Sequence, residues 1–246
     1  MADSRATSFG AEAQNYEAGR PEYPFEAVAW MLDILPVGAN RIADVGAGTG
    51  KLTRALVAAP GAQVVAIDPD PGMLAALRAA LPGVPTFVGT AESLPLPDAG
   101  VDAVVLGQAW HWVDPVAASR EIGRVVRPGG ALGLIWNVRD ERADWVRALT
   151  EIMHPSAAEE MLAQGAPIVD APFGALESAS WEWSREISRE QLHRLASSRS
   201  AVIIADEDER SRIRRAMDAL FDDLGLHDGT ITLPYVTRAF RAIREA

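Results

Sequence analysis

Short apolar runs alternate with segments of helical spacing through residues 24–137, and this alternation restricts the fold more than any other feature. Helical spacing is found at 24–35, 51–59, 71–81 and 114–126. The apolar runs lie at 41–45, 63–68, 84–89, 101–107 and 131–137. Strands that are apolar along their whole length are typical of a sheet covered by helices on both faces. We therefore expect an α/β protein with a doubly wound, mostly parallel sheet.

The pattern changes after residue 137. Further helices are predicted at 141–152, 188–198 and 206–224, further strands at 176–186 and 230–240, and irregular chain at 153–174. The late strands would add an edge to the sheet, and residues 141–225 would form, with residues 1–23, a lid over a ligand pocket. A chain of 246 residues suffices for one large core, so we expect a single domain over 1–246.

The segment ADVGAGTG, residues 43–50, connects the first predicted strand to a helix. Its three glycines let the backbone turn tightly and approach a ligand. The residue after Gly50 is Lys51, so the dinucleotide spacing G-x-G-x-x-G fails, and no G-K-[ST] sequence follows as in a P-loop. The next strand ends at Asp68, where an acid suits ribose hydroxyls. We expect a nucleoside ligand here; a glycine turn without a ligand is the alternative.

Composition excludes several classes of partner and site. The formal net charge of -11 opposes binding to nucleic acid, and the absence of cysteine excludes thiol nucleophiles and thiolate metal sites. The spacing of His154, His193 and His227 is not that of metal ligands, so we expect no metal. The sequence has no signal-like leader and no apolar run of about 18 residues, and we expect a cytoplasmic protein without a membrane partner.

Several stretches resemble, in order, the motifs of class I S-adenosylmethionine-dependent methyltransferases. They are ADVGAGTG, VVAIDPD, GTAESLPLPD, VDAVVLGQAWHW and RVVRPGGALGLIW. The stretches YEAGRPEYP and AWHWVD resemble more narrowly the type 11 group, which includes trans-aconitate methyltransferase-like proteins. The resemblance covers residues 9–140 well. It implies a Rossmann-like, seven-stranded sheet with a reversed last strand, divided into a cofactor-covering segment (1–23), a cofactor-binding core (24–140) and an acceptor-side region (141–246).

The resemblance also implies which residues bind the cofactor, S-adenosylmethionine. The glycine-loop backbone would hold its methionine part, an acid in the loop its amino group, and the acid after the second strand its ribose. The adenine would be covered by a methionine, for which a core role is the alternative, and bordered by the chain after the third strand. There Thr90 departs from the acid of many relatives. The implied residues are Tyr16, Arg20, Asp44, Gly46, Gly48, Gly50, Asp68, Met73, Ala91, Glu92 and Gln108.

The stretch GQAWHW, residues 107–112, follows the fourth predicted strand and would reach the reactive end of the cofactor. His111, expected to titrate near neutrality, is either a general base for a hydroxyl acceptor or a residue that orients the loop. Trp110 and Trp112 either face the sulfonium and acceptor or pack in the core. Arg139 and Arg199 either hold an acceptor carboxylate or form surface ion pairs.

We therefore expect an enzyme that transfers a methyl group from S-adenosylmethionine to a carboxylate or hydroxyl oxygen of a small molecule. Methyl transfer needs alignment and exclusion of water more than an acid–base pair, so the lack of an evident catalytic dyad is compatible with it. The alternatives are a nicotinamide-dependent oxidoreductase and a non-catalytic cofactor-binding module. The sequence does not indicate an oligomeric state.

Overall fold

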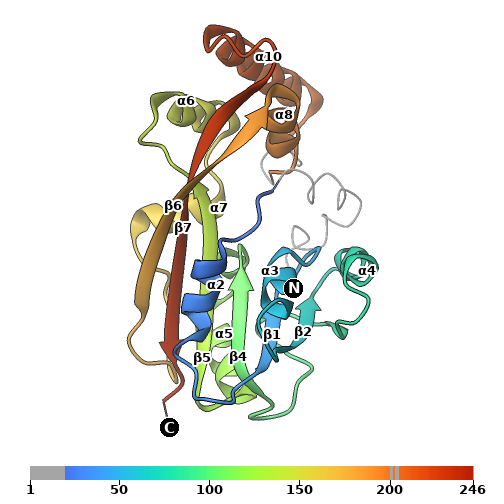
Figure 1. Cartoon of the computed structure of the whole chain (residues 1–246), viewed down its shortest axis with the longest axis vertical. Coiled ribbons are helices and arrows are strands. Elements are labelled where there is room, and N and C mark those ends of the chain that lie inside the picture. Colours follow the sequence, from blue (N-terminus) through green and yellow to red (C-terminus); the bar gives the residue numbers. More distant parts are fainter. Residues whose placement is uncertain (1–19, 200–201, 203–204, 246) are drawn as a thin grey trace.

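A seven-stranded sheet organises the chain in a computed structural model that describes residues 20–199, 202 and 205–245. The strand order is β3-β2-β1-β4-β5-β7-β6, and β7 alone runs antiparallel to the other strands (Figure 1). The strands are β1 (Arg41–Val45), β2 (Gln63–Asp68), β3 (Thr86–Val88), β4 (Val101–Gly107), β5 (Val126–Arg139), β6 (Glu177–Ser188) and β7 (Thr230–Ile243). The predicted Rossmann-like sheet with a reversed last strand is confirmed. Its order reverses between β1 and β4, where open α/β sheets bind ligands.

The apolar runs of β1, β4 and β5 form parallel strands because each contributes to two hydrophobic cores at once, whereas β3 at the edge of the sheet is largely exposed. Ile42, Val105 and Ile135 pack with α2 (Phe25–Leu32) and α3 (Lys51–Val57) on one face. Ala43, Val104 and Leu134 pack with α5 (Pro115–Val125) on the other face. Asp70 and Asp114 cap α4 (Pro71–Ala80) and α5, each followed by a proline at the first helical position.

β5 is longer than predicted: it begins at Val126, where the preceding helix was expected to end, and continues to Arg139. Val126 pairs with Val101 and Ala131 with Ala103, with a register shift between the two pairs. β6 and β7 are also longer than expected and pair along their whole length, from Glu177 opposite Arg241 to Ser188 opposite Thr230.

The far ends of β6 and β7 extend beyond the parallel strands and carry three helices (Figure 1). These are α6 (Asp144–Met153), α8 (Arg189–Ser197) and α10 (Glu207–Asp223). They enclose a separate core with Ile187, Leu233 and Tyr235. No helix among the described residues is long and apolar enough to cross a membrane.

The expectation of irregular chain at 153–174 is wrong for part of that segment, which forms α7 (Ala157–Gln164). A capping box starts this helix: Ser156 Oγ accepts from the Glu159 backbone N–H at 3.3 Å, and the Glu159 carboxylate accepts from the Ser156 N–H at 2.7 Å. The spacing S-A-A-E before M-L-A is a sequence signal for such a helix start. It would have predicted α7 and drawn attention to Glu159.

Candidate functional site

A cavity of about 760 Å³ opens at the carboxyl ends of the parallel strands. It is bounded by the glycine loop, the loops after β2, β3, β4 and β5, the start of α7 and the end of α8. The structure brings most of the predicted residues to its wall, namely Arg20, Gly46, Gly48, Asp68, Met73, Ala91, Glu92, Gln108, His111, Trp112, Arg139 and Arg199. The sequence reasoning missed further lining residues: Asn137, Ser156, Glu159, Ser198 and Tyr235.

Three predicted residues lie elsewhere and one lies outside the described residues. Gly50 precedes α3 at φ 96°, and an added Cβ would come within 2.9 Å of Leu77, so its role is in packing. Trp110 is 2% exposed and donates from Nε1 to the Ile168 carbonyl at 3.0 Å, which fits the packing alternative and not a substrate contact. Asp44 lines a smaller neighbouring cavity. Tyr16 is the residue outside the described part of the chain.

The glycine loop uses left-handed backbone conformations that other residues rarely adopt. Gly46 has φ 68° and Gly48 has φ 56°. A Cβ on Gly46 would come within 2.6 Å of Ala109 Cβ, whereas a Cβ on Gly48 would meet no atom within 4 Å. Gly48 therefore leaves its backbone open to the cavity that it lines. Gln108, on the facing loop, has φ 56° without being a glycine, a strained conformation of the kind that occurs at functional sites.

Asp44 is a buried acid beside this loop with one carboxylate oxygen satisfied. Its Oδ2 accepts from Thr53 Oγ1 at 2.6 Å, and its Oδ1 has no hydrogen-bond partner among the described residues. Burial raises its pKa to about 7, against the opposing effect of the Thr53 hydrogen bond. Asp44 lines the smaller cavity, of about 50 Å³, together with Gly46, Gly48 and Gln108. An ammonium group would supply both a hydrogen bond and an opposite charge to this unpartnered carboxylate oxygen, so the residues present fit the amino acid tail of a ligand.

Asp68 ends β2 at the wall of the main cavity. Its Oδ2 accepts from the Gly48 N–H at 2.9 Å and its Oδ1 from the Asp70 N–H at 2.8 Å. Burial raises the pKa of Asp68, and these two backbone hydrogen bonds oppose that rise. They fix the orientation of the carboxylate. Each oxygen of an ionised carboxylate can accept a further hydrogen bond, so two ribose hydroxyls remain compatible with this arrangement.

Met73, Ala91 and Glu92, the residues expected to border an adenine, lie together on the cavity wall. Met73 lines the cavity and is 4% exposed, so the cofactor-covering and core alternatives both describe it. Ala91 is buried at the same wall. Glu92 Oε1 accepts from the Asp114 N–H at 3.0 Å, which connects the loop after β3 to the start of α5.

His111 lies in the short helix η2 (Trp110–Trp112), and the expectation that it titrates near neutrality is wrong for these surroundings. Burial, and then the nearby charge of Arg20, lower its pKa to about 3. Its Nδ1 lies 3.4 Å from Trp136 Nε1, which can only donate, so the neutral ring carries its proton on Nε2. A neutral imidazole in this tautomer is a hydrogen-bond donor to the cavity and a poor general base.

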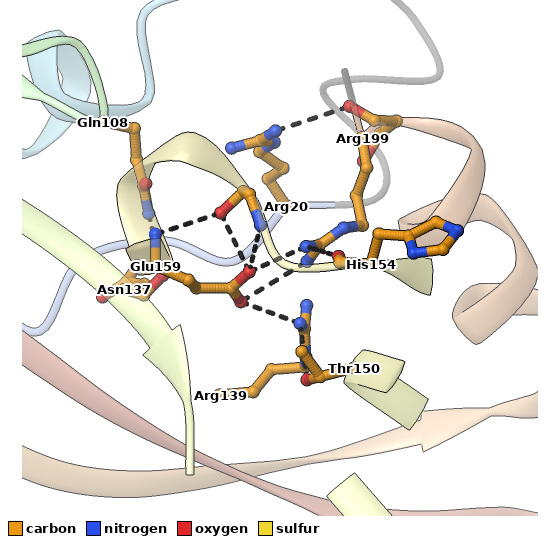
Figure 2. A network of polar contacts seen from close by, with 10 residues as sticks. Arg20, Gln108, Asn137, Arg139, Thr150, His154, Glu159 and Arg199 are labelled. Atoms are coloured by element: carbon orange, nitrogen blue, oxygen red, sulfur yellow. Dashed lines mark hydrogen bonds and ion pairs between the residues drawn. The ribbon is translucent and has the colours of Figure 1, made fainter. Parts of the chain in front are cut away.

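The part of the cavity wall formed by β5, the start of α7 and the chain after α8 contains a buried ionic network that joins these three segments (Figure 2). Arg139 at the end of β5 donates from Nη2 to Glu159 Oε1 at 2.8 Å and to Thr150 Oγ1 at 3.0 Å. Arg199, just after α8, donates from Nη2 to Glu159 Oε2 at 2.7 Å and to the His154 carbonyl at 2.6 Å. The two arginines are 7% and 6% exposed, so the surface alternative is excluded, but each does pair with an acid.

Glu159 and Arg139 are both ionised at neutral pH. Burial would raise the pKa of Glu159, but the charges of Arg139 and Arg199 outweigh it and lower the pKa to about 2. Burial, then the charge of Arg199, lower the pKa of Arg139 to about 10. Among the described residues, no group of three or more His, Asp or Glu side chains is placed to hold a metal ion.

The strand order, the reversed β7 and the glycine loop between β1 and α3 define a class I methyltransferase fold. A family model described as a methyltransferase domain matches residues 43–134. An uncharacterized methyltransferase of Mycobacterium tuberculosis is 46% identical over 244 residues, covering 96% of this chain and 95% of that protein. The chain therefore belongs to the methyltransferase family.

Solved structures agree with this assignment at the level of the fold. A structure assigned to a type II methyltransferase of Anaeromyxobacter dehalogenans matches with a TM-score of 0.67 at 24% identity, over 92% of this chain and 97% of that one. A phosphoethanolamine N-methyltransferase of Haemonchus contortus, solved with S-adenosylhomocysteine, matches with a TM-score of 0.53 at 14% identity, over 96% of this chain and 58% of that one. The narrower trans-aconitate methyltransferase-like group stays a prediction.

Proposed function

We propose that this protein transfers a methyl group from S-adenosylmethionine to an oxygen of a small-molecule acceptor, either a carboxylate or a hydroxyl. One observation carries the proposal: a single cavity connects the glycine loop and Asp68 to the buried pair Arg139 and Arg199. The first half fits a nucleoside with an amino acid tail, and the second fits an acceptor. The net charge of -11 further supports a small molecule over nucleic acid.

The cofactor half would act by binding and orientation. Asp44 Oδ1 would accept from the ligand ammonium, Asp68 from the ribose hydroxyls, and the Gln108 carbonyl would contribute a second acceptor for the ammonium. When bound, S-adenosylmethionine supplies a methyl group attached to a sulfonium sulfur. This sulfur leaves as a neutral thioether, so its departure needs no acid. The chain therefore has to hold the acceptor oxygen in line and keep water out, and positioning of this kind can supply roughly 7–11 kcal/mol of a barrier.

The surroundings of His111 favour a carboxylate over a hydroxyl as the methylated group. A carboxylate oxygen is already ionised, whereas a hydroxyl must lose a proton during transfer. The Nε2–H of the neutral ring can donate to one carboxylate oxygen and thereby orient the other. We therefore assign His111 an orienting role toward the acceptor, with Trp112 beside it at a ring separation of 4.9 Å.

Calorimetry with S-adenosylhomocysteine and with NAD, followed by a methyl-transfer screen on carboxylic and hydroxy acids, tests the proposal. We expect binding of S-adenosylhomocysteine but not of NAD, and transfer to at least one carboxylate. Binding of NAD alone would favour the oxidoreductase. Tight binding of S-adenosylhomocysteine without turnover on any acceptor would favour a non-catalytic module.

A further inference from the structure

Glu159 occupies the acceptor half of the cavity in a position that the proposed chemistry does not use. Its carboxylate receives five hydrogen bonds: from Arg139, from Nη1 and Nη2 of Arg199, and from the N–H and hydroxyl of Ser156. The residue lies in the first turn of α7 and lines the cavity together with both arginines (Figure 2). Its carboxylate is therefore fixed in place, ionised and adjacent to any acceptor that enters.

The network of Arg139, Arg199 and Glu159 has one net positive charge, because two guanidinium groups share one carboxylate. Arg139 Nε and Arg199 Nε are both buried and have no hydrogen-bond partner among the described residues. A buried donor without an acceptor is costly, and more so on a charged group. An anionic ligand group that reaches this network would supply both the missing negative charge and acceptors for the two Nε–H donors.

Among the described residues, the other acids that line the cavity do not supply the missing negative charge. Asp68 ends β2, and Arg139 ends β5, three strands away in the sheet order. At the usual spacing between strands this separation is about 14 Å, beyond a direct ion pair. The Glu92 carboxylate accepts from the Asp114 backbone N–H in the loop after β3, and β3 lies still further from β5 in the sheet order. The positive charge on the acceptor side is thus left for the ligand.

We propose that Glu159 sets the charge of the acceptor. It compensates one of the two positive charges of the buried arginine pair and leaves the other uncompensated. The site therefore selects an acceptor that is anchored by a single carboxylate. This inference rests on the proposed function. A singly charged anion leaves the buried network neutral. A dianion leaves it with an uncompensated negative charge, which is unfavourable in a buried site.

Propionate and malonate are suitable probes, because they are similar in size and carry one and two negative charges. Their affinities are measured by melting-temperature titration at fixed ionic strength, with and without saturating S-adenosylhomocysteine. The variant is Glu159→Gln, which keeps the side-chain shape and can still accept from Ser156. The matched control is Glu160→Gln, the same change one residue further on the same helix at an exposed position.

Wild-type protein and the Glu160→Gln control are expected to bind propionate at least as tightly as malonate. Glu159→Gln should shift the ratio of the two affinities at least tenfold toward malonate. A ratio within twofold of the control, tighter binding of malonate by the wild type, or no binding of either anion would each overturn the proposal. Failure of S-adenosylhomocysteine to raise the melting temperature would instead count against the proposed function, and the anion series without it would still be decisive for Glu159.

Arg199→Gln provides a second test if Glu159→Gln does not fold. It leaves Glu159 paired with Arg139 alone, so the network becomes neutral. Binding of propionate should then fall at least tenfold relative to the wild type. Retention of the wild-type propionate affinity within twofold would contradict the inference.

Discussion

Replacement of Asp44 by asparagine should weaken the binding of the amino acid tail of the cofactor without weakening the binding of its nucleoside. Asp44 Oδ1 is buried without a hydrogen-bond partner among the described residues, next to the glycine loop. A hydrogen bond between charged groups is worth about 1.5–3 kcal/mol, which corresponds to roughly tenfold or more in affinity. Asp44→Asn should therefore weaken S-adenosylhomocysteine at least tenfold at pH 8. It should leave 5′-methylthioadenosine, which has the same nucleoside and no amino acid tail, within about twofold.

The pH dependence provides an independent check of the same contact. Because the pKa of Asp44 is raised to about 7, the carboxyl becomes neutral below that pH and loses its attraction for an ammonium. The affinity for S-adenosylhomocysteine should fall as pH drops below about 7, approaching tenfold per pH unit. Burial also raises the pKa of Asp68, whose protonation affects both ligands. The ratio of the two ligand affinities therefore isolates Asp44, and this ratio should become independent of pH in Asp44→Asn.

Folding stability gives the control for this variant. A carboxyl whose pKa is higher in the folded state adds stability that is fully present below its unfolded pKa, 3.8, and is lost as pH rises through about 7. The shift corresponds to about 4 kcal/mol, so the melting temperature of Asp44→Asn at pH 8 should be no lower than that of the wild type. Unchanged affinity for S-adenosylhomocysteine, or an equal loss for both ligands, would refute the assignment of Asp44 to the ammonium.

Two further predictions concern the ribose contact of Asp68 and the role of His111 toward the acceptor. Asp68→Ala should weaken S-adenosylhomocysteine and 5′-methylthioadenosine alike, at least tenfold by calorimetry, because both carry the ribose; a loss confined to the first ligand would exclude a ribose contact. His111→Ala should lower turnover less than about tenfold and leave the rate between pH 6 and 8 without a step due to this residue, because its pKa is held near 3. A loss of a hundredfold or more would restore the general-base role.

Local sequence signals were sufficient for most of the fold. Ala103 to Leu106 form an uninterrupted apolar run because both faces of β4 are buried. Asp114 followed by Pro115 indicates the start of α5 through backbone groups close in sequence. The helix α7 was missed because it has only eight residues and lies in a stretch with prolines, although its capping box was legible.

The acceptor side could not be derived from the sequence in the same way. Glu159 meets Arg139 and Arg199 across 20 and 40 residues, and no local pattern specifies such contacts. The low pKa of His111 likewise follows from burial and from Arg20, both of which depend on the complete fold. The glycine loop was identifiable because its requirement for positive φ angles is imposed residue by residue.

β7 takes part in three hydrophobic cores at different points along its length. Ala239 packs beneath the cofactor half, whereas Leu233 and Tyr235 pack among the helices that carry the acceptor half. The residues between Tyr235 and Ala239 form the boundary between the two proposed halves of the site. At this boundary the acceptor half of a relative could be joined to the cofactor half of this protein. Such an exchange would replace the core among α6, α8 and α10 nearly whole and leave the two cores at the parallel strands nearly untouched. A lineage could in this way acquire new acceptors while inheriting its cofactor site unchanged.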